Sequence, residues 1–211
     1  MTNATRAGQL ILVRHGETEW SANGRHTGRT DLPLTPRGKA HAVALAPLLA
    51  DLLGGRPPAL VLTSPLRRAA DTAELADLTA EPEPALYEVD YGAYEGLTTP
   101  EIRVDTPGWT VWTGDLPDGE TLSQVAERVD HVLARVRPLL AGGDVVLVAH
   151  GHVLRILAAR WLGLPPSEGR LLALGTATVS VLGTEHETSV LVRWNLPNPA
   201  AATTPTQKER A

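Results

Sequence analysis

The chain has 211 residues, 43% of them hydrophobic, and a formal net charge of −5 at pH 7. This length and composition predict one domain with a substantial core, and the lack of a basic block argues against a nucleic-acid partner. No cysteine is present, which excludes disulfides and thiolate sites, and no apolar stretch reaches the roughly 20 residues of a membrane span. With no signal-peptide-like apolar core in the first ten residues, we expect a cytoplasmic protein without a membrane partner.

Short β-like runs alternate with helical periods, which predicts an α/β fold with a largely parallel sheet. The expected strands are bounded by Gly, Pro or polar residues and are Gln9–Val13, Ala59–Thr63, Asp144–Ala149, Ala177–Leu182 and Ser189–Trp194. Apolar residues three or four apart predict helices over Thr121–Leu140 and over Arg37–Leu53, where Pro47 is expected to introduce a kink. Residues 1–196 are expected to form the single domain, and the Pro- and Ala-rich residues 197–211 a disordered tail.

The first chemical motif is Arg14-His15-Gly16, which follows the first strand. Open α/β sheets bind ligands at the carboxyl ends of their strands, and phosphoryl transfer needs a nucleophile surrounded by positive charge. The motif therefore indicates chemistry on phosphate esters.

A second motif places Arg67 and Arg68 just after the second strand, with Ser64 as the expected N-cap and Pro65 as the first helical residue. An arginine in the first turn of such a helix can reach a phosphate held near the helix N-terminus. The alternative is a solvated surface arginine.

The third motif, His150-Gly151-His152, repeats the first at the end of another buried strand, so that two histidines can face one pocket. A metal site at His150 and His152 is the rival interpretation, but Gly151 indicates a turn, and we expect no metal. In the fourth motif, a loop rich in Gly and Tyr, Glu88 is the candidate donor of a proton to a leaving alkoxide.

Taken together, the four motifs resemble those of the histidine phosphatase superfamily, also called phosphoglycerate mutase-like, from Leu10 to about Asn195. The resemblance implies a three-layer α/β/α sandwich with a mostly parallel central sheet and helices on both faces. It further implies that His15 becomes phosphohistidine, that Arg14, Arg68 and a protonated His150 complete the phosphate pocket, and that Glu88 is the proton donor. Arg67 is then a surface residue.

The implied reaction is metal-independent hydrolysis of a small phosphorylated metabolite to inorganic phosphate, with no cofactor. The closer likeness is to the acid phosphatase and sugar-bisphosphatase branches, in which Ser21, His26, Thr27, Gly28 and Gly151 line the substrate side. Arg25 and Arg29 are candidates for a second anionic group, or solvated arginines. The family also suggests a possible homodimer.

Two alternatives stay open. A cofactor-dependent phosphoglycerate mutase is disfavoured because residues 97–119 contain a single basic residue, Arg103, among several acidic ones, and because Ser21 replaces a phosphate-binding asparagine of mutases. A non-catalytic phosphate-binding module is disfavoured because every expected site position holds a competent residue. Trp109 and Trp112 either cap the pocket or pack a loop.

Overall fold

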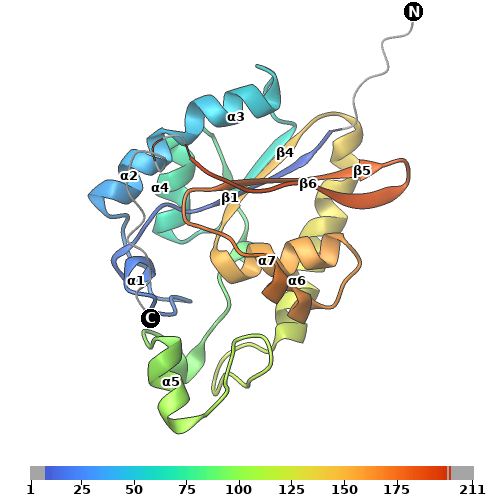
Figure 1. Cartoon of the computed structure of the whole chain (residues 1–211). Coiled ribbons are helices and arrows are strands. Elements are labelled where there is room, and N and C mark those ends of the chain that lie inside the picture. Colours follow the sequence, from blue (N-terminus) through green and yellow to red (C-terminus); the bar gives the residue numbers. More distant parts are fainter. Residues whose placement is uncertain (1–7, 199, 201–211) are drawn as a thin grey trace, which may run out of the picture.

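In the computed structural model of the protein, which describes residues 8–198 and 200, six strands form one central sheet (Figure 1). Their order across the sheet is β3-β2-β4-β1-β5-β6. The first four in the chain run parallel, β5 runs antiparallel to β1, and β6 runs antiparallel to β5. The bounds are β1 Leu10–Arg14, β2 Leu60–Thr63, β3 Glu81–Pro82, β4 Val145–Ala149, β5 Val179–Glu185 and β6 Thr188–Leu196. The mostly parallel α/β sheet is confirmed. The sequence does not predict the two-residue β3, which is too short to show alternation.

Seven α-helices and four short 3₁₀ segments accompany the sheet in the described residues. The α-helices are α1 Glu19–Ala22, α2 Pro36–Val43, α3 Leu45–Leu53, α4 Arg67–Leu75, α5 Thr99–Asp105, α6 Leu122–Val136 and α7 Gly151–Trp161. The 3₁₀ segments are η1 Pro84–Leu86, η2 Gly92–Tyr94, η3 Arg137–Ala141 and η4 Pro166–Leu171. The predicted helix over Thr121–Leu140 is α6 followed by η3, because Pro138 has no N–H to continue the α-helical pattern.

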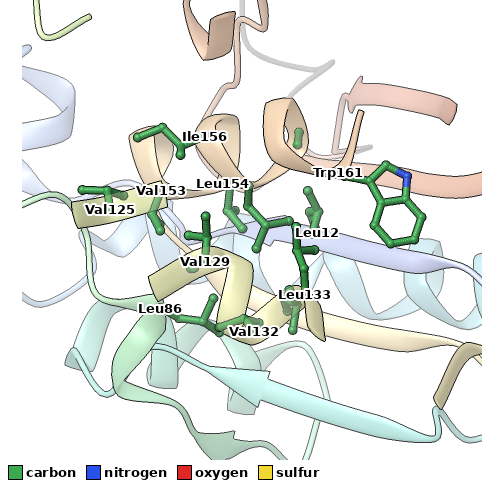
Figure 2. Packing of buried hydrophobic residues seen from close by; sticks show 14 of the residues in the cluster. Leu12, Leu86, Val125, Val129, Val132, Leu133, Val153, Leu154, Ile156 and Trp161 are labelled. Carbon is green, nitrogen blue, oxygen red and sulfur yellow. The ribbon is translucent and has the colours of Figure 1, made fainter. Parts of the chain in front are cut away.

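Alternate residues of each central strand belong to different cores, which gives the sandwich its three layers. Leu10 and Leu12 of β1 pack in one core with α6 and α7, whereas Ile11 and Val13 pack in the other with α3 and α4. Figure 2 shows the first core, in which Leu12 lies among side chains of α6 and α7. Complete burial of each such side chain contributes about 1.5–3 kcal/mol, so the strands between the layers are held firmly.

The helix predicted over Arg37–Leu53 with a kink at Pro47 is interrupted more fully than expected, because the chain forms two helices that meet at Ala44. Pro47 has no N–H to donate to the carbonyl of Val43, and its ring would clash with that carbonyl. The helix therefore ends at Val43 and starts again at Leu45, with Pro47 in the first turn of α3, where no N–H is needed. The break lies three residues before the proline that causes it.

Ser64 is not the N-cap of the next helix, so this prediction is also wrong. Helix α4 begins at Arg67, and Leu66 is its N-cap residue without a side-chain hydrogen bond. The Ser64 hydroxyl is instead 2.8 Å from His150 Nε2. This partner is 86 positions away in the chain, so a local capping rule does not predict it.

Part of the predicted tail, 197–211, lies within the described residues. Asn198 is buried and donates through its side-chain amide to the backbone carbonyl of His41 in α2. Residues 199 and 201–211 lie outside the described part of the chain. Within that part, no helix is both long and apolar enough to cross a membrane.

Candidate active site

The carboxyl ends of three adjacent strands bring the motifs together. Arg14 of β1 pairs in register with Ala149 of β4, so the next residues, His15 and His150, follow neighbouring strand ends. The His15 N–H donates to the Ala149 carbonyl at 2.9 Å, and the Ser64 N–H after β2 donates to the Val148 carbonyl at 2.9 Å. Three segments far apart in the sequence therefore meet at one edge of the sheet.

His15 is held in one tautomer. Its Nδ1 is 2.7 Å from the Gly16 carbonyl oxygen, which can only accept, so Nδ1 carries the proton and Nε2 keeps its lone pair. Burial, and then the charges of Arg68 and Arg14, hold the pKa of His15 well below its ordinary value. His15 is thus a neutral imidazole with a nucleophilic Nε2.

A cavity of about 170 Å³ lies in front of these strand ends. It is lined by Arg14, His15, Ser21, Gly24, Arg25, His26, Thr27, Glu88, Tyr91, Gly151, His152, Arg155 and Leu174. Three predicted residues, Arg68, His150 and Gly28, are absent from this lining.

Arg14 has a buried nitrogen with no partner in the described residues. Its Nη1 donates to the Leu174 carbonyl, whereas its Nε is buried without a hydrogen bond. Gly151 makes room for this side chain, because a Cβ at that position would lie 3.2 Å from Arg14 Cζ. A buried, unpaired guanidinium N–H beside a nucleophile fits a site that binds an anion.

Arg68 and His150 form a fully buried network next to His15, whose ring centroid is 5.1 Å from that of His150. Arg68 donates to the backbone carbonyls of Thr27, Gly28 and Thr30 at 2.9–3.1 Å. Its Nε also donates to His150 Nδ1 at 3.0 Å. Because Nδ1 accepts, the ring is neutral and its Nε2–H donates to Ser64.

The expectation of a protonated His150 is therefore wrong. Burial, then the charge of Arg68, lowers the pKa of His150 well below its ordinary value, in agreement with this pattern of hydrogen bonds.

Glu88 is buried against the start of α7. Its Oε1 accepts from the N–H groups of Val89 at 3.0 Å and Val153 at 2.9 Å, and its Oε2 from His152 N–H at 3.0 Å. Arg128 in α6 holds the Glu88 loop, because it donates to the Glu88 carbonyl at 3.2 Å and to those of Ala85 and Tyr87 at 2.7 Å. Backbone N–H groups therefore hold the carboxyl group, and Arg128 holds the backbone of the loop that carries it.

On the substrate side, Ser21, His26 and Thr27 line the cavity as predicted, but Gly28 does not. The Gly28 N–H donates to the Glu95 carboxylate at 2.9 Å, and a Cβ would lie 2.5 Å from the Val89 carbonyl oxygen. A larger residue would not fit at position 28, because the neighbouring backbone is too close. The prediction that Gly28 lines the substrate side is wrong.

Tyr91, His152 and Arg155 also line the cavity. The sequence analysis considered His152 as an alternative metal ligand and assigned no site role to Tyr91 and Arg155. The Tyr91 hydroxyl lies 2.6 Å from His152 Nδ1, and the Arg155 guanidinium stacks over Trp112 at 4.4 Å. Arg155 is four residues after Gly151, which places both on one face of α7. This spacing of four residues is the sequence signal from which Arg155 could have been predicted to line the cavity.

Two of the remaining candidates, Arg29 and Trp109, have packing roles. Arg29 pairs with Asp90 at 3.3 Å and lies over the Tyr87 ring, outside the cavity lining. Trp109 is buried, with its Nε1–H donated to the Asp115 carbonyl at 2.9 Å. Arg25 does line the cavity, but it is 3.5 Å from Glu101.

Within residues 8–198 and 200, no group of three or more His, Cys, Asp or Glu side chains is arranged to hold a metal ion. The ring of His150 contacts Ser64 and Arg68, whereas the ring of His152 contacts Tyr91. The geometry does not give these two histidines a common ligand.

A sequence model of the histidine phosphatase superfamily, branch 1, matches residues 10–197. The chain belongs to this family. It is 44% identical over 198 residues to an acid phosphatase of Mycobacterium tuberculosis, with 92% of this chain and 97% of the relative covered. It is 34% identical over 185 residues to sedoheptulose 1,7-bisphosphatase of Saccharomyces cerevisiae, with 74% and 68% covered.

A solved structure of an M. tuberculosis open reading frame superposes on this histidine phosphatase with a TM-score of 0.87 at 42% identity, covering 92% of this chain and all of the other. The predicted superfamily, fold and class of enzyme, a phosphoric monoester hydrolase, are confirmed.

The buried histidines make the phosphatase sensitive to acid. Burial lowers the pKa values of His15, His150 and His152 well below the ordinary value of about 6.5. Below that pH the unfolded chain binds protons that the folded protein does not, so stability falls as the pH falls. Each group contributes up to about 1.4 kcal/mol per pH unit, and we expect a loss of about 2–4 kcal/mol between about pH 7 and pH 5.5.

Urea unfolding at the two pH values measures this loss. The exposed His131 in α6 offers a matched control, since His131→Ala should keep the full pH dependence, whereas His152→Asn should lose about one third of it. Equal stability at both pH values would contradict the neutral state of the buried histidines.

Proposed function

We propose that this enzyme hydrolyses small phosphorylated metabolites through a phosphohistidine on His15, without a metal or an organic cofactor. One observation carries the proposal: a neutral His15, with Nε2 unprotonated, shares one cavity with an unpaired Arg14 N–H and with Glu88. Nucleophile, charge stabiliser and proton donor are the three groups that phosphomonoester cleavage requires.

In the first step the Nε2 lone pair of His15 forms the N–P bond while the bond from phosphorus to the ester oxygen breaks. Glu88 gives its proton to that oxygen, and the alcohol leaves. We assign the proton to Oε2, which accepts one backbone hydrogen bond where Oε1 accepts two. Arg14 stabilises the charge on the phosphoryl oxygens.

In the second step Glu88, now a carboxylate, removes a proton from water as the water attacks phosphorus. The N–P bond breaks, its electrons return to Nε2, and inorganic phosphate leaves. Arg68 and the neutral His150 support the wall around His15 through their network, and Ser21, His26 and Thr27 face the leaving group. Because the sequence has none of the cysteines that stabilise many secreted domains, we place this activity in the cytoplasm.

The proton donor can be tested through the leaving group. We expect Glu88→Gln to lower kcat/KM for an alkyl phosphate by about 10²–10⁴ and for p-nitrophenyl phosphate by less than about tenfold, because nitrophenolate leaves without a proton. Phosphate release with EDTA present measures both. Glu127→Gln, an exposed site on α6, is the matched control. Equal losses for both esters would contradict the donor role.

The mutase alternative makes a different prediction in the same assay. Arg103 donates to the Trp109 carbonyl at 2.8 Å and is absent from the cavity lining, so the basic residue of the 97–119 region is not placed to hold a bisphosphoglycerate. Isomerisation of phosphoglycerate with a bisphosphate primer, without phosphate release, would favour a mutase.

A further inference from the structure

Arg155 lies on the side of the cavity away from the nucleophile along α7. Gly151, at the start of this helix, packs on the Arg14 guanidinium, and Arg155 follows four residues later, about 6 Å along the helix axis. Residues four apart share a helix face, and both line the same cavity. The leaving group of an ester whose phosphate contacts Arg14 would therefore extend toward Arg155.

The Arg155 side chain is preorganised. Its guanidinium lies over the Trp112 ring, with Cζ 4.4 Å from the ring centroid. Its Nε donates to the Gly169 carbonyl at 3.0 Å and its Nη2 to the Arg170 carbonyl at 3.3 Å, while Nη1 has no partner among residues 8–198 and 200. An arginine fixed in this way loses little side-chain entropy when it binds an anion.

No carboxylate of the described residues lies in direct contact with Arg155. Arg25, another cation of the lining, is 3.5 Å from Glu101, whereas Arg155 forms no ion pair in the described residues. Glu88 is the acidic residue of the lining, and it already accepts three backbone hydrogen bonds. Burial, followed by the nearby charge of Arg14, lowers the pKa of Arg155, while the charge of Glu88 acts in the opposite direction.

We propose that Arg155 binds a second anionic group, a carboxylate or a phosphate on the leaving group, and that this enzyme prefers doubly anionic phosphate esters. The inference rests on the proposed function and identifies the substrate class of that site. Arg155 takes the role for which the sequence suggested Arg25 and Arg29.

The test compares esters that differ by one anionic group. The carboxylate pair is 3-phosphoglycerate and glycerol 3-phosphate, and the phosphate pair is fructose 1,6-bisphosphate and fructose 1-phosphate. We expect the doubly anionic ester of at least one pair to have a kcat/KM larger by on the order of 10- to 100-fold, and the responding pair identifies the group that is bound. Arg155→Gln should remove this advantage through KM, leave p-nitrophenyl phosphate turnover within about threefold, and be partly rescued by Arg155→Lys.

Arg137 provides a matched control. Its guanidinium lies 4.0 Å from the Trp161 ring centroid and donates to a backbone carbonyl, as that of Arg155 does, but it is absent from the cavity lining. Arg137→Gln should therefore leave the preference for doubly anionic esters unchanged. A wild-type enzyme without that preference, or an Arg155→Gln variant that loses activity equally on both members of a pair, would overturn the inference.

Equilibrium binding separates this inference from the proposed function. Titration of 3-phosphoglycerate and glycerol 3-phosphate into His15→Ala, with and without Arg155→Gln, needs no turnover. Charge-selective binding that is lost with Arg155→Gln supports the inference even if His15→Ala keeps phosphatase activity, a result that would refute the proposed nucleophile alone. Equal binding of both esters would overturn the inference even if His15 proves to be the nucleophile.

Discussion

Replacing His15 with alanine should lower kcat for phosphate release by on the order of 10⁴-fold or more, because the attacking atom itself is lost. His15 Nε2 is the one nitrogen of this ring left unprotonated by the hydrogen bond to the Gly16 carbonyl. A water molecule that attacked phosphorus directly would hydrolyse the ester without forming a covalent intermediate with the enzyme. We expect the variant to fold, because the buried apolar side chains of the central strands, which hold the sheet between its two helical layers, are unchanged.

The measurement is phosphate release from p-nitrophenyl phosphate with EDTA present, together with rapid trapping of a phosphorylated protein. His131→Ala is the matched control, since it removes an exposed histidine of α6 from outside the cavity. Wild type and His131→Ala should give a phosphoenzyme that is stable in alkali and labile in acid, as phosphoramidates are. Turnover by pure His15→Ala above about one per cent of wild type would exclude His15 as the nucleophile.

Local patterns were sufficient to predict the strand ends that position the site. A buried β run followed by His-Gly occurs at His15 and again at His150, and parallel pairing of β1 with β4 places both at one edge. Each of the two motifs can be recognised from a few consecutive residues, although the pairing of β1 with β4 is a contact between distant segments. His15 and Glu88 were accordingly picked out from the sequence, and both line the cavity in the structure.

The errors of the sequence analysis arise from contacts between distant segments. Ser64 has the sequence context of an N-cap, but His150, 86 residues later, takes its hydroxyl. Gly28 has the composition of a binding loop, but its N–H and the space around it are occupied by Glu95 and Val89. Arg155 lies in the middle of an apolar helix, and its position on the cavity depends on how α7 packs. Such contacts are decided by tertiary packing and not by local propensity.

The structure also changes the interpretation of Arg68. From sequence it is a phosphate ligand that reaches over a helix N-terminus, but in the fold it is fully buried and its donors are directed at backbone carbonyls and His150. The loop of Thr27 and Thr30, which comes before α2, is thereby tied to α4. Arg68 holds the wall of the cavity that Thr27 lines, and it fixes His150 as a neutral acceptor.

Arg68→Met should therefore cost about 3–5 kcal/mol in the free energy of unfolding, because it leaves the carbonyls of Thr27, Gly28 and Thr30 without donors in the interior. Methionine keeps much of the length and apolar volume, so the loss reports hydrogen bonds more than packing. We also expect kcat/KM to fall by at least about 10²-fold, because the network that orients His150 beside His15 is broken. Urea unfolding and phosphate release measure the two effects.

The adjacent arginine is the natural control for this prediction. Arg67 is exposed and pairs with Asp71 at 3.3 Å within α4, so Arg67→Met should change stability by less than about 1 kcal/mol and leave kcat/KM within a few-fold. Arg68→Lys separates charge from geometry: one ammonium cannot reach all three carbonyls and His150 Nδ1, so the variant should stay closer to Arg68→Met than to wild type in stability. If Arg68→Lys restored full stability, the charge alone would matter; if Arg68→Met lost activity but no stability, Arg68 would be a direct phosphate ligand, as the sequence first suggested.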